Sequence, residues 1–243
     1  MRIFAVSDLL LGSYGPVEWL QGLDRLALHW DRVVTSDDVV VIPGGFSVAE
    51  NLREVEASLL WLASRPGRVF VGASRTDRWY SGNYLYVHRA LPLNITLLNT
   101  EAALIDGGRI ALVVGRGRIA PGMPWWQPAR DERVYKLYIK RLCKALRTIQ
   151  QAPVKIVALH EPPYGDRAGP LVCAMAGHRV NYVLYGSLTG PQHRLAVDDK
   201  RWGMEFRCVS TDYIKFYPRL IVDTKQEFPY LYEGCDQNVD YCN

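Results

Sequence analysis

Polar and glycine-rich segments follow five short apolar runs in the sequence, and these segments carry the residue types that could do chemistry. The central segment, 72–77, reads Gly-Ala-Ser-Arg-Thr-Asp and follows the apolar run 68–71. The other four read Ser-Asp-Leu-Leu (7–10), Pro-Gly-Gly-Phe (43–46), His-Glu-Pro-Pro (160–163) and Tyr-Gly-Ser-Leu-Thr-Gly (185–190). Because sites in α/β folds form at the carboxyl ends of the strands, we expect the five segments to meet at one edge.

The spacing of apolar residues predicts the elements that position these segments. Apolar, largely β-branched runs predict strands at 3–6, 39–42, 69–71, 95–98, 110–114, 156–159 and 182–185, and a closing hairpin of 206–209 with 214–217. Apolar residues at three-to-four spacing predict helices from about 16, at about 48–64 and at 131–150. Strands that alternate with helices in this way predict an α/β sandwich.

Length and composition limit the class of protein. With 243 residues, 49% of them hydrophobic and 22% charged, the chain is long enough for one large domain with its own core. No apolar run approaches the ~20 residues of a membrane span, so we expect no membrane partner. No signal peptide is recognisable, and the five cysteines are scattered without metal-ligand spacing. These features predict a cytoplasmic protein.

The net charge of +4 is divided unevenly along the chain. Residues 223–243 carry five acidic side chains and one lysine, a balance of −4, which leaves +8 on residues 1–222. We expect one domain over 1–222 and an acidic, aromatic tail over 223–243. The tail's aromatic residues suggest that it docks on a basic surface, its own or a neighbour's. A solvated terminus is the ordinary alternative.

The order of the five segments resembles the calcineurin-like metallophosphoesterases, particularly the small bacterial predicted phosphohydrolases of that superfamily. The resemblance covers about 1–222 and includes Pro-Gly-Arg at 66–68, Arg-Ala-Leu-Pro at 89–92 and Ser-Thr-Asp-Tyr at 210–213. It implies a metallophosphoesterase-like α/β sandwich of two mainly mixed β-sheets flanked by helices. In that family the segments read Asp-x-His, Gly-Asp, Gly-Asn-His-Asp, a lone His and Gly-His-x-His. They hold two divalent cations that hydrolyse phosphoesters.

This chain departs from those motifs at most metal-binding positions. Asp8 is kept, but Leu10 stands at the position of the next His and Gly45 at that of the bridging Asp. His160 is the remaining lone His. Losing the bridging carboxylate leaves two cations unscreened from each other, so the resemblance implies the fold without implying the reaction.

The third segment also lacks its metal-binding Asn and its proton-donating His. In the ungapped register Arg75, Thr76 and Asp77 stand at the family's Asn, His and final Asp. Matching by the glycine at 72 instead places Ala73, Ser74 and Arg75 there. In both registers the general acid for the leaving alkoxide is missing.

Ser187 and Thr189 replace the family's final pair of histidines, and neutral hydroxyls are weak ligands for transition metals. We therefore expect a catalytically inactive homologue, a pseudoenzyme that acts as a binding or structural module in a larger assembly, with vestigial Asp8 and His160 and with no metal or cofactor. The alternative is an active metal-dependent phosphoesterase with manganese or another divalent metal at a rebuilt site. That site would draw on Asp8, Asp77, His160, Glu161 and Asp212.

Without a cation, the Asp8 carboxylate needs another partner. Arg75 could pair with it, or could point to solvent as most arginines do. The segments could also bind a phosphate or nucleotide without metal, although loop hydroxyls more often satisfy local backbone groups. The candidate ligand-binding residues are Asp8, Ser74, Arg75, Thr76, Asp77, His160, Ser187 and Thr189.

Partner contacts are expected from the loops, the tail and one helix, with a protein or a second copy as partner. The helix at 131–150 carries a basic stripe, which is a candidate surface for nucleic acid or an acidic partner. No nucleic-acid motif accompanies it, so a solvated helix face is favoured. The stripe comprises Arg133, Lys136, Lys140, Lys144 and Arg147. The loop aromatics could anchor an interface or cap the sheet ends; they are Trp79, Tyr80, Tyr84, Trp125 and Trp126.

Overall fold

Two β-sheets form the centre of the computed structural model, which describes residues 1–13, 15–81 and 84–226. The first sheet contains β1 (Arg2–Ala5), β2 (Val39–Ile42), β3 (Arg68–Gly72), β4 (Ile95–Leu98) and β11 (Arg219–Asp223). The second contains β5 (Glu101–Ile105), β6 (Ile110–Gly115), β7 (Val154–Leu159), β8 (Tyr182–Tyr185), β9 (Lys200–Arg201) and β10 (Met204–Cys208).

Both sheets are mixed: the strands are parallel except at one edge of the first sheet and at both edges of the second. The first has the order β11-β1-β2-β3-β4, in which β11 is the antiparallel strand. The second has the order β5-β6-β7-β8-β10-β9, with β5 and β9 antiparallel to their neighbours. The carboxyl ends of β1, β2 and β3 therefore lie at one edge of the first sheet, and those of β6, β7 and β8 at one edge of the second.

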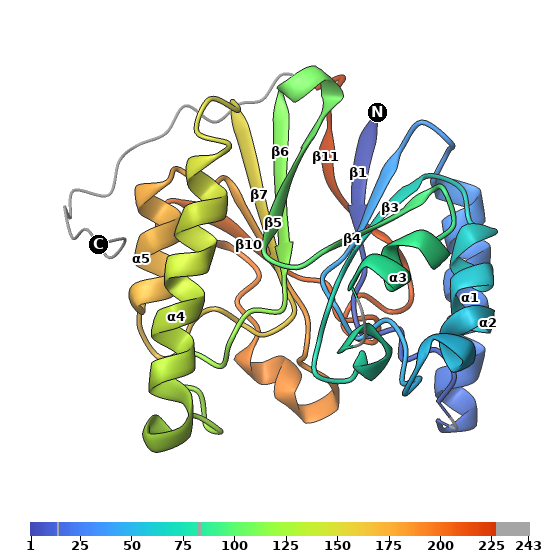
Figure 1. Cartoon of the computed structure of the whole chain (residues 1–243), viewed down its shortest axis with the longest axis horizontal. Helices are drawn as coiled ribbons and strands as arrows, with labels where there is room; N and C mark the ends of the chain where they lie inside the picture. Colours follow the sequence, from blue (N-terminus) through green and yellow to red (C-terminus); the bar gives the residue numbers. More distant parts are fainter. Residues whose placement is uncertain (14, 82–83, 227–243) are drawn as a thin grey trace.

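Helices cover the outer face of each sheet, so the molecule has four layers (Figure 1). α1 (Val17–Val33), α2 (Leu52–Ala63) and α3 (Tyr84–Ala90) pack on the first sheet. α4 (Pro128–Arg147) and α5 (Pro170–Gly177) pack on the second. Short 3₁₀ helices occupy connecting segments: η1 (Arg78–Ser81), η2 (Asp106–Gly108) and η3 (Gly190–Leu195).

The central strands are mainly apolar because both of their faces are buried. In β1, Ile3 and Ala5 belong to the core between the sheets, while Phe4 belongs to the core under the helices. This alternation is the two-residue period of a strand. A strand covered on both faces needs apolar residues at every position, which is why its sequence reads as a continuous apolar run.

The expected fold class is confirmed: the chain is an α/β protein with two mixed sheets flanked by helices. The predicted closing hairpin is wrong. Segment 214–217 forms turns, since Lys215 and Phe216 have φ angles of 55° and 59°, which a strand cannot contain. The last strand is β11, and it lies in the first sheet, whereas β10 lies in the second.

The predicted tail, 223–243, begins inside the folded part of the chain, since Asp223 ends β11 and the hydroxyl of Thr224 donates to the carbonyl of Met1 at 2.9 Å. Residues 227–243 lie outside the described residues, so the docking of the tail stays a prediction. Among the described residues, no helix combines the length and the apolar character needed to cross a membrane.

Candidate functional site

The loops after β1, β7 and β8 meet at one buried carboxylate, that of Asp8. Nε2 of His160 lies 2.8 Å from its Oδ1. The backbone N–H of Ser187 and the hydroxyl of Ser210 both donate to its Oδ2, each at 2.9 Å. Asp8 is 4% exposed and His160 is 5% exposed. Protein donors thus occupy both carboxylate oxygens, and the expected gathering of these loops is confirmed.

The main chain also packs directly against this carboxylate. A Cβ atom on Gly186 would lie 2.6 Å from Oδ2 of Asp8 and 2.2 Å from Oγ of Ser7. A Cβ on Gly45, whose φ is +67°, would lie 2.8 Å from Oδ1 of Asp8. Real side chains do not reach such distances, so only glycine fits at both positions. The surroundings of Asp8 are therefore filled by backbone.

Three residues of these loops hold left-handed backbone conformations without being glycine. Asp8, Leu10 and Ser187 have φ angles of 61°, 49° and 64°. Such conformations cost free energy and concentrate at functional sites, where the surrounding structure enforces them. The hydrogen bonds on Asp8 supply that enforcement here.

His160 carries the positive charge that compensates Asp8. Burial alone would lower the pKa of the imidazole. Attraction to Asp8 and the hydrogen bond to it outweigh burial, Glu161 and Asp77 add further negative charge nearby, and the net pKa is raised. His160 Nδ1 is buried and without a hydrogen-bond partner in the described part of the chain. Asp8 and His160 therefore form a buried ion pair at pH values below the raised pKa.

Asp77 lies next to this pair but ties two loops together. Its Oδ2 accepts hydrogen bonds from the N–H of Gly45 at 3.0 Å, from the N–H of Ser74 at 2.9 Å and from the hydroxyl of Ser74 at 2.6 Å. Its Oδ1 accepts from the N–H of Ser47 at 2.9 Å. The side chain is 3% exposed, so Asp77 is fully engaged in joining the loops after β2 and β3.

The prediction that Arg75 pairs with Asp8 is wrong. Arg75 is exposed, and His160 takes the place beside the carboxylate. The solvent-facing alternative is correct for its side chain, which lines a cavity at the surface. The neighbouring Thr76 is also exposed, and its hydroxyl lies 2.7 Å from that of Ser74.

Ser187 and Thr189, the two hydroxyl residues of the last segment, have local partners. The hydroxyl of Ser187 donates to Oε2 of Glu161 over 3.4 Å. Thr189 precedes η3, and its backbone N–H donates to the side chain of Gln192 at 3.3 Å. Of the eight candidate ligand-binding residues, direct hydrogen bonds join Asp8, His160 and Ser187 in one group. They join Ser74, Thr76 and Asp77 in a second group.

The residues present do not fit a two-metal centre. In the described ranges, no group of three or more His, Cys, Asp or Glu side chains converges as a metal site. Two dications clamped on a phosphoryl group need several such ligands, one of them shared. Asp8 is held by His160 and by N–H and O–H donors, and Asp77 by N–H and O–H donors.

Of the loop aromatics, Trp79 is buried and Tyr80, Trp125 and Trp126 are partly buried, while the side chain of Tyr84 lies outside the described part of the structure. Trp79 is 3% exposed and packs edge-on against Phe46 and Tyr80 with centroid distances of 6.0 and 5.9 Å. Trp79 therefore caps the end of the first sheet, one of the two roles expected for the loop aromatics, and does not present its ring to a partner. Trp125 and Trp126 are half-buried against the core under α4.

The basic stripe on α4 is exposed at all five positions, as expected. Within it, Lys136 pairs with Glu132 one turn away, at 2.6 Å. Such exposed pairs are typical of a solvated helix face.

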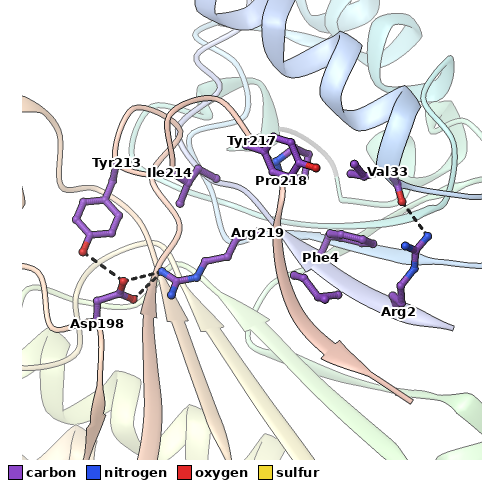
Figure 2. Close-up of a pocket in the computed structure, with 10 residues that line it drawn as sticks. Arg2, Phe4, Val33, Asp198, Tyr213, Ile214, Tyr217, Pro218 and Arg219 are labelled. Carbon is purple, nitrogen blue, oxygen red and sulfur yellow. Dashed lines mark hydrogen bonds and ion pairs between the residues drawn. The ribbon is translucent and has the colours of Figure 1, made fainter. Parts of the chain in front are cut away.

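A hollow of about 680 Å³ between the approach to β11 and the start of β1 has its charges already paired (Figure 2). Asp198 accepts two hydrogen bonds from Nη1 of Arg219, at 2.6 and 2.8 Å, and one from the hydroxyl of Tyr213 at 3.3 Å. Nη2 of Arg2 donates to the carbonyl of Val33 at 2.8 Å. The charged groups of this hollow are thus engaged in contacts within the chain.

A second hollow, of about 290 Å³, has an excess of positive charge and was missed by sequence reasoning. It lies where Arg75 meets the loop after β6 and the first turns of α4. We call it the arginine cavity; its lining is Arg75, Arg116, Arg118, Ile119, Arg130, Asp131, Val134 and Glu161. The sequence feature that could have indicated this cavity is the segment Gly-Arg-Gly-Arg at 115–118, which directly follows the strand predicted at 110–114.

Comparison with known proteins supports the fold and says nothing about activity. No family model and no curated protein matches the chain. Among solved structures, phosphopantetheinyl hydrolase (PptH) from Mycobacterium tuberculosis matches with a TM-score of 0.54 and 14% identity, over 94% of this chain and 98% of PptH. A protein of unknown function from Aquifex aeolicus matches with a TM-score of 0.44 and 13% identity, over 90% and 95% of the two chains, too weak a likeness to carry an argument. The chain therefore shares its fold with a phosphopantetheinyl hydrolase to which it is 14% identical in sequence.

Proposed function

We propose that this chain is a calcineurin-like metallophosphoesterase scaffold that has lost the two-metal reaction and acts as a binding or structural module. The fold shared with a hydrolase and the order of the loops support the descent. The loss of metal ligands supports the absence of turnover.

The observation that carries this proposal is that protein hydrogen-bond donors occupy the carboxylate of Asp8. In a metal centre its carboxylate would face cations, whereas here His160, Ser187 and Ser210 supply one donor each. The backbone of Gly45 and Gly186 closes the remaining approach. A metal would have to displace the imidazolium and reorganise two loops to reach this carboxylate, and desolvating a dication for so few ligands is unfavourable.

The surfaces offered to a partner are the loops at the carboxyl edge and, in the prediction from sequence, the acidic tail. A protein partner or a second copy of the chain is the proposed occupant, and a cytoplasmic location remains part of the proposal. Nucleic acid is not favoured, since the stripe on α4 is an exposed helix face without a base-reading motif.

Metal loading and turnover measured on one preparation test the proposal. The full chain is incubated with manganese, dialysed, analysed for bound metal and assayed with an aryl phosphate. The proposal expects neither stoichiometric metal nor turnover above the metal-free sample. Stoichiometric manganese, with a rate that His160→Ala abolishes, would establish the alternative of a rebuilt active site. His29→Ala is the matched control, because His29 lies on α1 and its Nδ1 bonds to the backbone carbonyl of Phe216 at 3.1 Å rather than to a residue of the alternative site.

A further inference from the structure

The arginine cavity holds three guanidinium groups that lack an acidic partner. Arg75, Arg116 and Arg118 each line it, and in the part of the chain that the structure describes none of the three forms an ion pair. Nε of Arg116 and Nε of Arg118 are buried with no hydrogen-bond partner in the described residues. Buried donors of this kind are costly unless something binds them.

The acidic groups at the cavity do not balance this charge. Asp131 is already held by Arg130, whose Nε and Nη2 donate to its two oxygens at 2.6 and 2.7 Å. Glu161 remains as one carboxylate beside three guanidiniums without an ion pair in the described part of the chain, and its Oε2 accepts from Ser187. Nη1 of Arg118 also donates to the carbonyl of Gly117 at 3.3 Å, a contact that brings no negative charge. The cavity therefore has a formal excess of two positive charges at neutral pH.

The arginines of the cavity are close enough for their charges to shift the pKa of Arg116. Burial lowers the pKa of the Arg116 guanidinium, and the nearby charges of Arg118 and Arg75 lower it further, while Glu161 and Asp77 oppose the change. Like charges gathered in a partly buried space are unfavourable unless an anion sits between them.

The loop that carries Arg116 and Arg118 is held in place by contacts outside the cavity. The carbonyl of Arg116 accepts a hydrogen bond from the N–H of Glu161 at 3.0 Å. The N–H of Gly117 donates to the hydroxyl of Tyr138 at 3.1 Å. Gly117 has a φ of +72°, and a Cβ there would lie 3.0 Å from the Glu161 carbonyl. The cavity is preformed, which lowers the cost of binding.

Size and donor type define the ligand. A space of about 290 Å³ is near the lower end for small-molecule sites and suits a compact anion. Guanidinium groups present planar forked donors that match phosphate oxygens, and several arginines together favour a group with more than one negative charge.

We infer that the arginine cavity is a metal-free binding site for a small phosphate-bearing anion such as pyrophosphate or a phosphomonoester. The inference deepens the proposed function, since it names the ligand class of a module that does not turn its ligand over. Glu161 follows His160 directly, so the cavity adjoins the Asp8–His160 pair.

Calorimetric titration with inorganic pyrophosphate tests the site. Inorganic phosphate and citrate are titrated at matched ionic strength, because citrate carries as much charge without a phosphoryl group. We expect saturable one-site binding of pyrophosphate, weaker binding of phosphate and weaker still of citrate. Arg75→Ala should weaken pyrophosphate binding about tenfold, the scale of one hydrogen bond between charged groups.

Two further variants give the test its controls. Arg116→Lys keeps the charge and loses the forked donor, so it should weaken binding about as much as Arg75→Ala. Arg53→Ala removes an exposed arginine from α2, on the other sheet, and should leave binding within about twofold, as expected of a distant surface charge. Thermal unfolding of each variant shows that it remains folded. Arg75 is exposed, so its replacement should not disturb the fold.

The outcomes separate this inference from the proposed function. Binding of pyrophosphate without hydrolysis, lost in Arg75→Ala, supports both. Binding with hydrolysis supports the cavity and overturns the non-catalytic proposal. Absence of saturable binding, equal binding to Arg75→Ala and Arg53→Ala, or binding of a single-stranded oligonucleotide that pyrophosphate does not displace would overturn the cavity inference and leave the non-catalytic proposal standing.

Discussion

Nε2 of His160 lies 2.8 Å from Oδ1 of Asp8, at the point where loops from the two sheets meet, and both side chains are buried. The imidazolium supplies the counter-charge of the buried carboxylate. Removing either partner would leave the other buried without its counter-charge, and breaking a buried pair costs about 3–5 kcal/mol.

His160→Ala should therefore lower the free energy of unfolding by about 3 kcal/mol at pH 6, since it leaves Asp8 buried without a cation. His193→Ala breaks a partly exposed pair with Asp212 and should cost about 1 kcal/mol or less. Urea unfolding followed by circular dichroism gives both values. Equal losses in the two variants would mean that the Asp8–His160 pair is no more important than a surface pair.

The stability of the wild-type chain should also depend on pH through His160. Because the folded pKa is raised above the unfolded value of about 6.5, the stabilisation is complete below about pH 6.5 and is lost as pH rises through the folded pKa. Urea unfolding across pH 6 to 9 should show this decline in the wild type and in His193→Ala. The decline should be reduced in His160→Ala; an unchanged pH profile in that variant would contradict the assignment.

Restoring the family's bridging carboxylate should not restore a metal site. Gly45→Asp places a Cβ 2.8 Å from the Cα and Oδ1 of Asp8, so we expect a loss of at least about 3 kcal/mol in stability and no manganese binding. Gly107→Asp is the matched control, because its φ of +63° is similar but no atom lies within 4 Å of its Cβ. It should cost about 1 kcal/mol, the backbone strain alone. A Gly45→Asp variant as stable as Gly107→Asp would show that the loops around Asp8 can open.

A second buried carboxylate should control acid unfolding. Burial alone would raise the pKa of Asp38, but hydrogen bonds from Arg2 and Thr35 lower it to about 2. Its stabilisation is present above about pH 4 and is lost as pH falls towards 2, a difference of about 2 kcal/mol. Asp38→Asn should lose that amount at pH 7 and converge with the wild type near pH 2, whereas Asp37→Asn, at an exposed position, should follow the wild type throughout. Urea unfolding at several pH values measures this, and parallel curves for Asp38→Asn and the wild type would be the contrary result.

Most of the fold could be predicted from the sequence because the central strands are buried on both faces. A run such as Val-Val-Val-Ile predicts a buried strand, and β2 has the predicted bounds. β5 was missed, since this edge strand is partly exposed and mixes Glu, Ala and Leu. α5 was missed as well, because its eight residues are apolar on all sides and show no helical period.

The site could be predicted at the level of loops but not of side-chain partners. Loop order correctly brought Asp8 and His160 together, because each follows a parallel strand. It could not decide which cation would sit beside Asp8, since Arg75 is long enough to reach several places. Nor could it find the arginine cavity, where Val134 is 41% exposed, because segments far apart in sequence create that surface.

The most direct measurement is the metal content of the purified full-length chain after incubation with excess manganese and dialysis. Since Asp8 is held by His160, Ser187 and Ser210, we expect no stoichiometric manganese and the same content in His160→Ala. Two tightly held manganese ions per chain, absent from His160→Ala, would contradict the loss of the two-metal centre.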